Sequence, residues 1–313
     1  MKHLKAVAAR LDELLEDPAL PGLAAIRSAG LAGAIPALSL DGGPVELLLR
    51  RYRPGLRATY EARSGQRRFA VKAYALDPAP EVELYEALAR AGLCVPPLLA
   101  WDRDLRLVII GWLEGPTAHQ LVKDRQGTRA GELAARWLRR TVSLSVKLGP
   151  PLDAANMLDH ARYWAASLGA ADRALGAGAT AVAGILERTL PREGVPRLVN
   201  GSFYPRHVLD TGGDAGLIDW ERFGQGPLEL DAGEFLANTW RIGLEHEDVA
   251  DEAARAAQAF LAGTAGLMDE RAVAWYRAAT LVRLANKWTR RPGDGLARPH
   301  ALLGEAARIA AAH

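Results

Sequence analysis

Residues 198–221 hold three side chains that could do chemistry together: the hydroxyl of Ser202, the imidazole of His207 and the carboxylate of Asp219. Apolar runs on either side of the turn at residues 211–214 predict a β-hairpin, which would fix the three side chains on one platform. Asp219 is a hard ligand for a divalent cation, and His207 suits Mn²⁺ or Zn²⁺ better than Mg²⁺, which prefers oxygen. At neutral pH the Ser202 hydroxyl cannot act as a general base without an activating partner.

A second charged side chain lies inside an apolar run. Lys72 stands in the sequence FAVKAY, and a helix expected from about residue 80 to residue 91 follows it with Glu81, Glu83 and Glu86. An ammonium group among apolar neighbours is costly to bury unless an opposite charge pairs with it. Lys72 is therefore expected to pair with one of these glutamates, unless its side chain extends to solvent from an exposed strand face.

Periodicity indicates which elements position these side chains. Alternating runs predict a three-stranded antiparallel meander over residues 45–52, 57–63 and 67–74, and two further strands over 97–101 and 106–112. Helical spacing predicts helices over residues 117–122, 128–148, 157–175, 178–190, 229–243, 247–264, 269–290 and 298–312. Residues 3–16 also show helical spacing, and an Ala/Gly-rich segment follows to about residue 40. This first segment is expected to be a helical cap, with a dimerisation arm as the alternative.

Composition limits the class of protein. The 313 residues suffice for two lobes with real cores, and 49% hydrophobic and 24% charged residues are ordinary globular values. A net charge of +2 gives no reason to expect a nucleic-acid partner. A single cysteine, Cys94, excludes an intramolecular disulfide framework and suits a reducing compartment. Without an apolar stretch of roughly 18 residues, no membrane segment is expected, and the predicted location is the cytoplasm.

In order and spacing, these motifs resemble the aminoglycoside phosphotransferase-like family, which has a protein-kinase-like fold. The resemblance covers roughly residues 45–236. It implies an α+β, two-lobed fold: an N-lobe of antiparallel sheet plus one helix over residues 45–113, and a mainly helical C-lobe with an inserted hairpin over residues 114–313. Residues 1–44 would be an N-terminal helical extension.

The resemblance also implies roles for residues of the N-lobe. Lys72 would pair with Glu81, or in second place Glu83, and contact the α- and β-phosphates of ATP. The hinge backbone around Gly111 and Leu113 would hydrogen-bond the adenine edge. In the turn between the first two strands, Arg53 and Arg57 would lie over the phosphates, or would simply be solvated.

The C-lobe motif departs from the family. Where the family has His-Gly-Asp followed five residues later by Asn, this chain reads Asn200-Gly201-Ser202 and then His207. Ser202 thus occupies the position of the usual base. Asp219 and His207 would hold Mg²⁺, or Mn²⁺ because of the imidazole, and Asp231 matches an acidic residue whose role in the family is mainly structural.

Two functions follow from the resemblance. One is an ATP-dependent phosphotransferase, a small-molecule kinase that transfers the γ-phosphoryl group to a hydroxyl of an unidentified acceptor. The other is a pseudokinase that binds nucleotide or ligand without turnover. A third hypothesis is that Ser202 is itself phosphorylated or otherwise modified. Glu245, Glu247 and Asp248 favour a cationic acceptor or, alternatively, complement the dipole of the helix that follows them. The sequence leaves the oligomeric state open.

Overall fold

The structure, a computed structural model, describes residues 8–9, 14–40, 43–290 and 295–312. The chain divides into two compact units, an N-terminal unit, Lys2–Leu113, and a C-terminal unit, Glu114–His313. Each unit has a hydrophobic cluster of its own.

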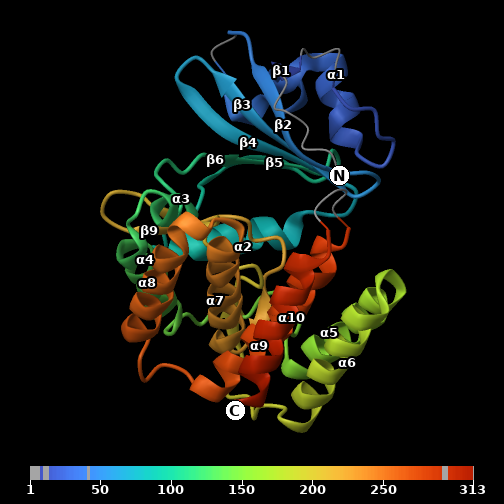
Figure 1. The fold of residues 1–313 in the computed structure, drawn as a ribbon. Helices are drawn as coiled ribbons and strands as arrows, with labels where there is room; N and C mark the ends of the chain where they lie inside the picture. Colours follow the sequence, from blue (N-terminus) through green and yellow to red (C-terminus); the bar gives the residue numbers. More distant parts are fainter. Residues whose placement is uncertain (1–7, 10–13, 41–42, 291–294, 313) are drawn as a thin grey trace. The chain divides into compact units, whose positions relative to one another are not determined.

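An antiparallel sheet with the strand order β1-β2-β3-β4-β6-β5 forms the frame of the N-terminal unit (Figure 1). Its strands are β1 (Ala8–Ala9), β2 (Glu46–Arg53), β3 (Arg57–Ser64), β4 (Arg67–Tyr74), β5 (Leu98–Asp102) and β6 (Leu107–Gly111). All five predicted strands are present as β2 to β6, and β1 adds a short sixth strand at the β2 edge. Gly55 and Gly65, with φ of 67° and 57°, turn the chain from β2 to β3 and from β3 to β4.

Helix α1 (Pro21–Ala34) and the 3₁₀ turn η2 (Pro36–Leu38) pack on this sheet. Leu23 and Ile26 of α1 share one buried cluster with Tyr60 and Phe69 of the strands, so this segment covers the sheet of its own unit. The helix predicted for residues 3–16 is wrong where the structure describes it, because Ala8–Ala9 pairs with β2 as a strand and residues 14–17 are not helical. The remainder of that prediction lies outside the described residues.

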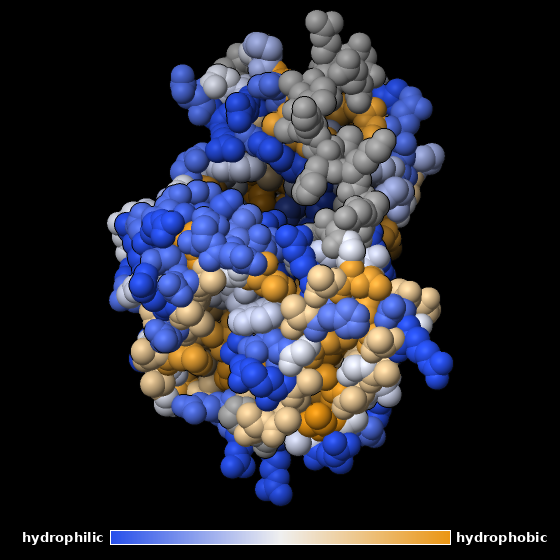
Figure 2. All heavy atoms as spheres, in the orientation of Figure 1, coloured by the Kyte–Doolittle hydropathy of each residue, from blue (hydrophilic) through white to orange (hydrophobic). Residues whose placement is uncertain are grey.

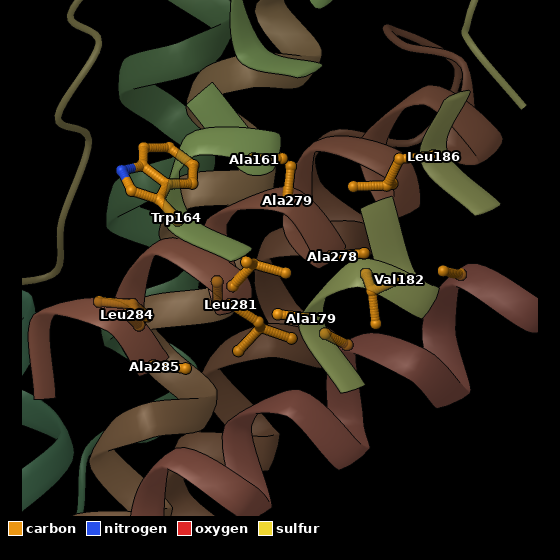
Figure 3. Packing of buried hydrophobic residues seen from close by; sticks show 14 of the residues in the cluster. Ala161, Trp164, Ala179, Val182, Leu186, Ala278, Ala279, Leu281, Leu284 and Ala285 are labelled. Carbon is orange, nitrogen blue, oxygen red and sulfur yellow. The ribbon is translucent and has the colours of Figure 1, made fainter. Parts of the chain in front are cut away.

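The C-terminal unit is mainly helical (Figure 1). Its helices are α3 (Ala118–Lys123), α4 (Gly127–Thr141), α5 (Ala154–Ala171), α6 (Arg173–Arg188), α7 (Leu228–Glu245), α8 (Ala250–Gly263), α9 (Glu270–Trp288) and α10 (Ala297–Ala311), with the 3₁₀ turn η3 (Glu247–Val249) before α8. The core lies among α5, α6, α9 and α10, where Figure 3 shows small side chains such as Ala161, Ala179 and Ala279 between larger ones such as Leu281. Small side chains let these helices approach one another closely.

Two helix predictions need correction. The helix predicted to run to residue 148 ends at Thr141, because the backbone beyond it bonds elsewhere: Gln225 Nε2 donates to the carbonyls of Val146 and Leu148, at 3.2 and 2.7 Å. The helices predicted over residues 157–175 and 178–190 instead meet at Asp172, so the Ala/Gly-rich segment of residues 169–178 is helical on both sides of that residue. Its glycines serve helix packing, since a Cβ on Gly176 would lie 2.3 Å from the Cα of Gly169.

The predicted hairpin is present in the C-terminal unit. Strands β8 (Val208–Asp210) and β9 (Ala215–Leu217) pair antiparallel around the turn, and β7 (Arg197–Val199) pairs with β10 (Gly224–Gly226). The β7–β10 pair was not predicted; it brackets the segment that carries Ser202, His207 and Asp219.

Hydrophilic and hydrophobic residues both reach the visible face of the C-terminal unit (Figure 2), as is usual for folded proteins. Among the described residues, no helix combines the length and the apolar character that a membrane crossing requires.

Candidate active site

In the N-terminal unit, Lys72 of β4 pairs with Glu81 of helix α2 (Ala79–Arg90). Lys72 is 6% exposed, and its Nζ lies 2.5 Å from Glu81 Oε1. The other carboxylate oxygen, Oε2, accepts a hydrogen bond from the Tyr74 hydroxyl at 2.5 Å. The predicted pairing with Glu81 is therefore present, Glu83 is exposed, and the alternative of an exposed Lys72 is wrong.

This arrangement keeps the Lys72 ammonium group protonated. Burial alone lowers the pKa of an ammonium group, but the attraction of Glu81 outweighs it and holds the pKa of Lys72 well above its usual value. The ring of Tyr85 adds a cation–π contact, with Lys72 Nζ 5.7 Å from its centroid. Lys72 is thus a fixed cation of the kind that holds phosphate oxygens.

The two arginines of the turn between β2 and β3 differ in their exposure to solvent. Arg53 is exposed, whereas Arg57 is 7% exposed and lies on the sheet face of Lys72, because Arg57 pairs with Tyr74 and Thr59 with Lys72. The amide of Gly55 in this turn donates to Asp17 Oδ2 at 2.7 Å. The carboxylate of Asp17 thereby ties the turn to the N-terminal segment, a contact that the sequence did not indicate.

The predicted hinge follows the end of β6 at Gly111. The Gly111 amide donates to the Pro97 carbonyl at 2.8 Å, and a Cβ at this position would lie 2.6 Å from Pro97 Cγ, so only glycine fits. Among the described residues, the backbone of Leu113 has no backbone hydrogen-bond partner. A hydrogen-bonding edge of a ligand could therefore use the Leu113 backbone but not the Gly111 amide.

In the C-terminal unit, Ser202 is held in a structural role. It is 4% exposed, and its Oγ lies 3.1 Å from Asn200 Oδ1 and 3.2 Å from the Asp219 carbonyl, either of which can accept its one proton. The imidazole of His207 bonds the Ser202 carbonyl instead of Oγ. Serine, histidine and aspartate are thus all present, but they do not form the hydrogen-bond relay of a hydrolase triad.

His207 and Asp219 face each other across a short gap. His207 Nδ1 lies 2.8 Å from the Ser202 carbonyl, which only accepts hydrogen bonds, so Nδ1 carries a proton. In the neutral ring Nε2 then presents a lone pair, 3.3 Å from Asp219 Oδ2. Asp219 has a φ of 62°, an uncommon and strained backbone for an aspartate, and Asn200 Nδ2 donates to its carbonyl at 3.2 Å.

Asp231, in the first turn of α7, anchors this loop. Its two carboxylate oxygens accept the amides of Asn200 and Gly201 at 2.8 and 2.9 Å. Asp231 is 3% exposed, and burial raises its pKa to about 7, although the two amide hydrogen bonds act in the opposite direction. Gly201 is required beside it, because its φ is 66° and a Cβ would lie 2.2 Å from the Arg222 carbonyl.

A layer behind the loop was missed by sequence reasoning. The ring of Tyr204 packs on that of His207, with centroids 4.9 Å apart, and the guanidinium of Arg283 lies 5.4 Å from the Tyr204 centroid. Arg283 Nη2 is 3.0 Å from Glu234 Oε1, and both residues are buried. The available signal was a charge with apolar or small neighbours, at Glu234 in the sequence AGEFLA of α7 and at Arg283 in the sequence LVRLA of α9.

The C-terminal residues fit a nucleotide-bound divalent cation. Asp219 offers a carboxylate and His207 an imidazole nitrogen, while Ser202 Oγ is engaged with its neighbours. No group of three or more metal-ligating side chains occurs among the described residues, so phosphate and water oxygens would have to complete the coordination. Magnesium is commonly held in this way, by one or two carboxylates and substrate phosphates.

The two units together define a protein-kinase-like fold, with the lysine–glutamate pair in the first unit and the acidic loop in the second. A model of the phosphotransferase enzyme family matches residues 38–247, more than half of the chain, and the protein therefore belongs to this family. A search of curated proteins found no match.

Solved structures share the fold. An aminoglycoside-3'-phosphotransferase of type VIII is 22% identical, with 75% of this chain and 93% of that chain covered and a TM-score of 0.54. A choline/ethanolamine kinase family protein from Mesorhizobium loti is 20% identical, with 90% and 92% covered and a TM-score of 0.58. A thermostable mutant of the aminoglycoside phosphotransferase APH(4)-Ia is 15% identical, with 85% and 94% covered and a TM-score of 0.62.

Proposed function

We propose that this protein is an ATP-dependent phosphotransferase that transfers the γ-phosphoryl group to a hydroxyl of a small molecule. The observation that carries the proposal is the buried Lys72–Glu81 pair in a member of a phosphotransferase family. A buried ion pair gains little stability over an apolar pair of similar size, because desolvation offsets most of its attraction. Retention of this pair is better explained by a ligand that needs the Lys72 charge.

In this proposal Lys72 binds the α- and β-phosphates, Asp219 and His207 hold the cation, and Leu113 contributes backbone groups to the adenine edge. The bound cation would neutralise phosphate charge. Asp231 keeps the loop of Ser202 in place through its two amide bonds. Related proteins have been solved with AMP-PNP and hygromycin B, and with ADP and spectinomycin, which supports a nucleotide donor and a hydroxylated acceptor here.

Loss of the carboxylate at position 202 does not exclude catalysis. Phosphoryl transfer depends mainly on positioning and on neutralisation of charge, so a missing base slows the reaction without abolishing it. A second function is nevertheless favoured by one observation: Ser202 Oγ is committed to Asn200 Oδ1 or the Asp219 carbonyl, as in a loop kept for its shape. That function is a pseudokinase, which binds nucleotide without turnover.

Thermal unfolding with ATP and with ADP, each with Mg²⁺ or Mn²⁺, tests the nucleotide site. A ligand at 100 times its Kd stabilises the folded state by about 2.7 kcal/mol, which raises the midpoint by several degrees. ADP release in the presence of a panel of hydroxylated small molecules then tests turnover. The absence of any nucleotide-dependent shift would contradict both functions, whereas phosphorylation of an acceptor would eliminate the pseudokinase.

A further inference from the structure

A carboxylate that precedes the family match holds the turn between β2 and β3. Asp17 Oδ2 accepts a hydrogen bond from the Gly55 amide at 2.7 Å and another from the Tyr52 hydroxyl at 3.0 Å. The match to the phosphotransferase family begins at residue 38, so Asp17 stands in a segment that the family model does not describe. Membership of the family therefore does not predict this contact.

Asp17 is itself a fixed anchor. Leu14 and Leu20, on either side of it, are 4% and 0% exposed and belong to the hydrophobic cluster that α1 shares with the sheet. Asp17 Oδ1 accepts the Ala19 amide at 3.0 Å, and the Asp17 carbonyl accepts the Leu20 amide at 2.9 Å. The hydrogen bond from the Gly55 amide holds the pKa of Asp17 below its usual value, so the carboxylate is charged at neutral pH.

The turn that Asp17 holds contributes no side chain to the core. Residues 53–56 are all exposed, and Leu56 is 57% exposed. An exposed turn of this kind is fixed mainly by its polar contacts and opens easily without them. A charge-assisted hydrogen bond to an anchored carboxylate is therefore well suited to determine where the turn lies.

Asp17 reaches the turn from the sheet face opposite to Lys72. Tyr52 pairs in register with Ala58, and both belong to or pack against the cluster of α1. Thr59 pairs with Lys72, and side chains one residue apart in a strand point to opposite faces. Helix α1 therefore covers one face, and α2, which holds the partner of Lys72, covers the other (Figure 1). The Asp17 carboxylate thus supports the turn without occupying the place of an anion at Lys72.

We infer that Asp17 is a positioning residue for the donor nucleotide, because it holds the β2–β3 turn where the turn covers phosphates bound at Lys72. The inference rests on the proposed function, which puts the phosphates at Lys72. Arg57, at the end of the turn, lies two residues beyond Thr59, the neighbour of Lys72. At a rise of about 3.4 Å per residue, this separation is about 7 Å, so a triphosphate chain held by Lys72 can reach the turn.

A turn that is fixed in advance does not have to be ordered by the ligand. The apparent Kd of a ligand equals its intrinsic Kd divided by the fraction of molecules in the binding-competent conformation. The Asp17 contact should therefore strengthen the binding of ATP. It should not change the binding of adenosine, which has no phosphate for the turn to cover.

Replacement of Asp17 by Ala tests this inference. With Mg²⁺ and fixed ionic strength, the Kd of ATP should rise by about 3- to 10-fold, as for a turn that is in place for a third to a tenth of the time. The Kd of adenosine should change by less than about twofold. Simple electrostatics predicts the opposite sign for ATP, because the variant removes a negative charge.

Two further measurements follow the contact itself. Asp17→Asn keeps one oxygen that can accept the Gly55 amide, so its Kd for ATP should lie between those of the wild type and Asp17→Ala. Hydrogen exchange at the Gly55 amide should be faster in Asp17→Ala than in the wild type, with or without nucleotide.

Asp102→Ala is the matched control. Asp102 Oδ1 accepts the Leu105 amide at 2.7 Å in the turn between β5 and β6, so this variant removes the same charge and the same kind of hydrogen bond from another turn of the sheet. Its Kd values for ATP and adenosine should match the wild type.

Three outcomes would overturn the inference while the proposed function stands: Asp17→Ala binds ATP as tightly as the wild type or more tightly, ATP and adenosine weaken equally, or Asp102→Ala loses as much ATP affinity. If the wild type binds neither ligand, the proposed function fails and the inference fails with it. In that case, faster exchange at Gly55 in Asp17→Ala would assign the contact to the fold alone.

Discussion

The N-terminal and C-terminal units, the two halves of the molecule, differ in how their buried polar groups are paired. In the N-terminal unit, buried charges are paired with opposite charges, Lys72 with Glu81 and Glu61 with three arginines. In the C-terminal unit, Ser202 stands where the resemblance to the family places a carboxylate, and Asp231 is buried with backbone amides as partners. In the proposed function, the first half binds the polyanionic nucleotide, and the second lacks the carboxylate that would take the acceptor's proton.

This difference separates binding from turnover. Changes in the N-terminal half should affect affinity and stability, because its charges are buried in pairs. Changes in the C-terminal half should affect rate and pH dependence, because in the proposed function a neutral serine stands at the position of the base and because burial raises the pKa of Asp231. Variants of the two halves should therefore separate nucleotide affinity from turnover rate.

The largest effect is expected from Ser202→Asp. The new carboxylate restores a base, and general-base assistance contributes about 10²- to 10⁴-fold in rate, so ADP release should increase by a factor in that range. Nucleotide affinity should change little, because the phosphate-binding charges lie in the other half. ATP hydrolysis to water gives a readout that does not require the acceptor.

A like charge near Asp219 could mask this gain by raising the pKa of either carboxyl group, so the assay should use saturating Mg²⁺ or Mn²⁺. The double variant Ser202→Asp with His207→Asn rebuilds the motif usual in the family and controls for the imidazole. If wild type binds ATP and neither variant turns over, the C-terminal half is not limited by the base, and the pseudokinase function is the better description.

Removal of one member of the Lys72–Glu81 pair should have the next largest effect. Lys72→Ala leaves Glu81 buried without its cation, which should lower the free energy of unfolding by about 3–5 kcal/mol and abolish most nucleotide binding. Stability and binding should both fall, because both members of the pair are less than one-tenth exposed.

A double variant, Lys72→Met with Glu81→Gln, separates the two consequences. It removes both charges, so chemical denaturation should show most of the stability restored. Its affinity for ATP should remain as low as that of Lys72→Ala. Recovery of ATP binding in the double variant would show that Lys72 acts on the fold alone and not on the phosphates.

Contacts between residues that are close in the sequence were predictable, whereas contacts between residues far apart in the sequence were not. Lys72 and Glu81 stand in consecutive elements, so an apolar strand and the next acidic helix were enough to predict their contact. The β8–β9 hairpin was predicted for the same reason, since its turn residues lie between the strands that they join.

Partners brought together by the fold were not predictable in this way. The alternation in β3 marks Arg57 and Glu61 as solvent-facing, but both are buried, and Glu61 is covered by arginines of the neighbouring strands. Glu234 and Arg283 stand in two separate helices, and they meet only because α7 and α9 pack together. Residue types alone would also have allowed a serine hydrolase triad, which the hydrogen bonds of His207 exclude.

The smallest expected effect, also in the C-terminal half, is on the pH dependence of stability. Asp231 has a pKa of about 7 in the folded protein, raised mainly by burial from the ordinary value of 3.8. Between these values the folded state holds a proton that the unfolded state has lost. Stability from this group is therefore complete below about pH 4 and declines as the pH rises through 7, by at most about 4 kcal/mol for three pH units. Glu234, whose pKa burial also raises, acts with the same sign. Glu61 of the other half, with its lowered pKa, acts with the opposite sign and only in acid.

Chemical denaturation of wild type and Asp231→Asn at intervals from pH 4 to pH 8 isolates the contribution of Asp231. The variant keeps an oxygen for one amide and cannot ionise, so its free energy of unfolding should fall less over this range. Parallel curves for the two proteins would mean that Asp231 is already ionised in the fold at pH 4, held by the amides of Asn200 and Gly201 against the cost of burial.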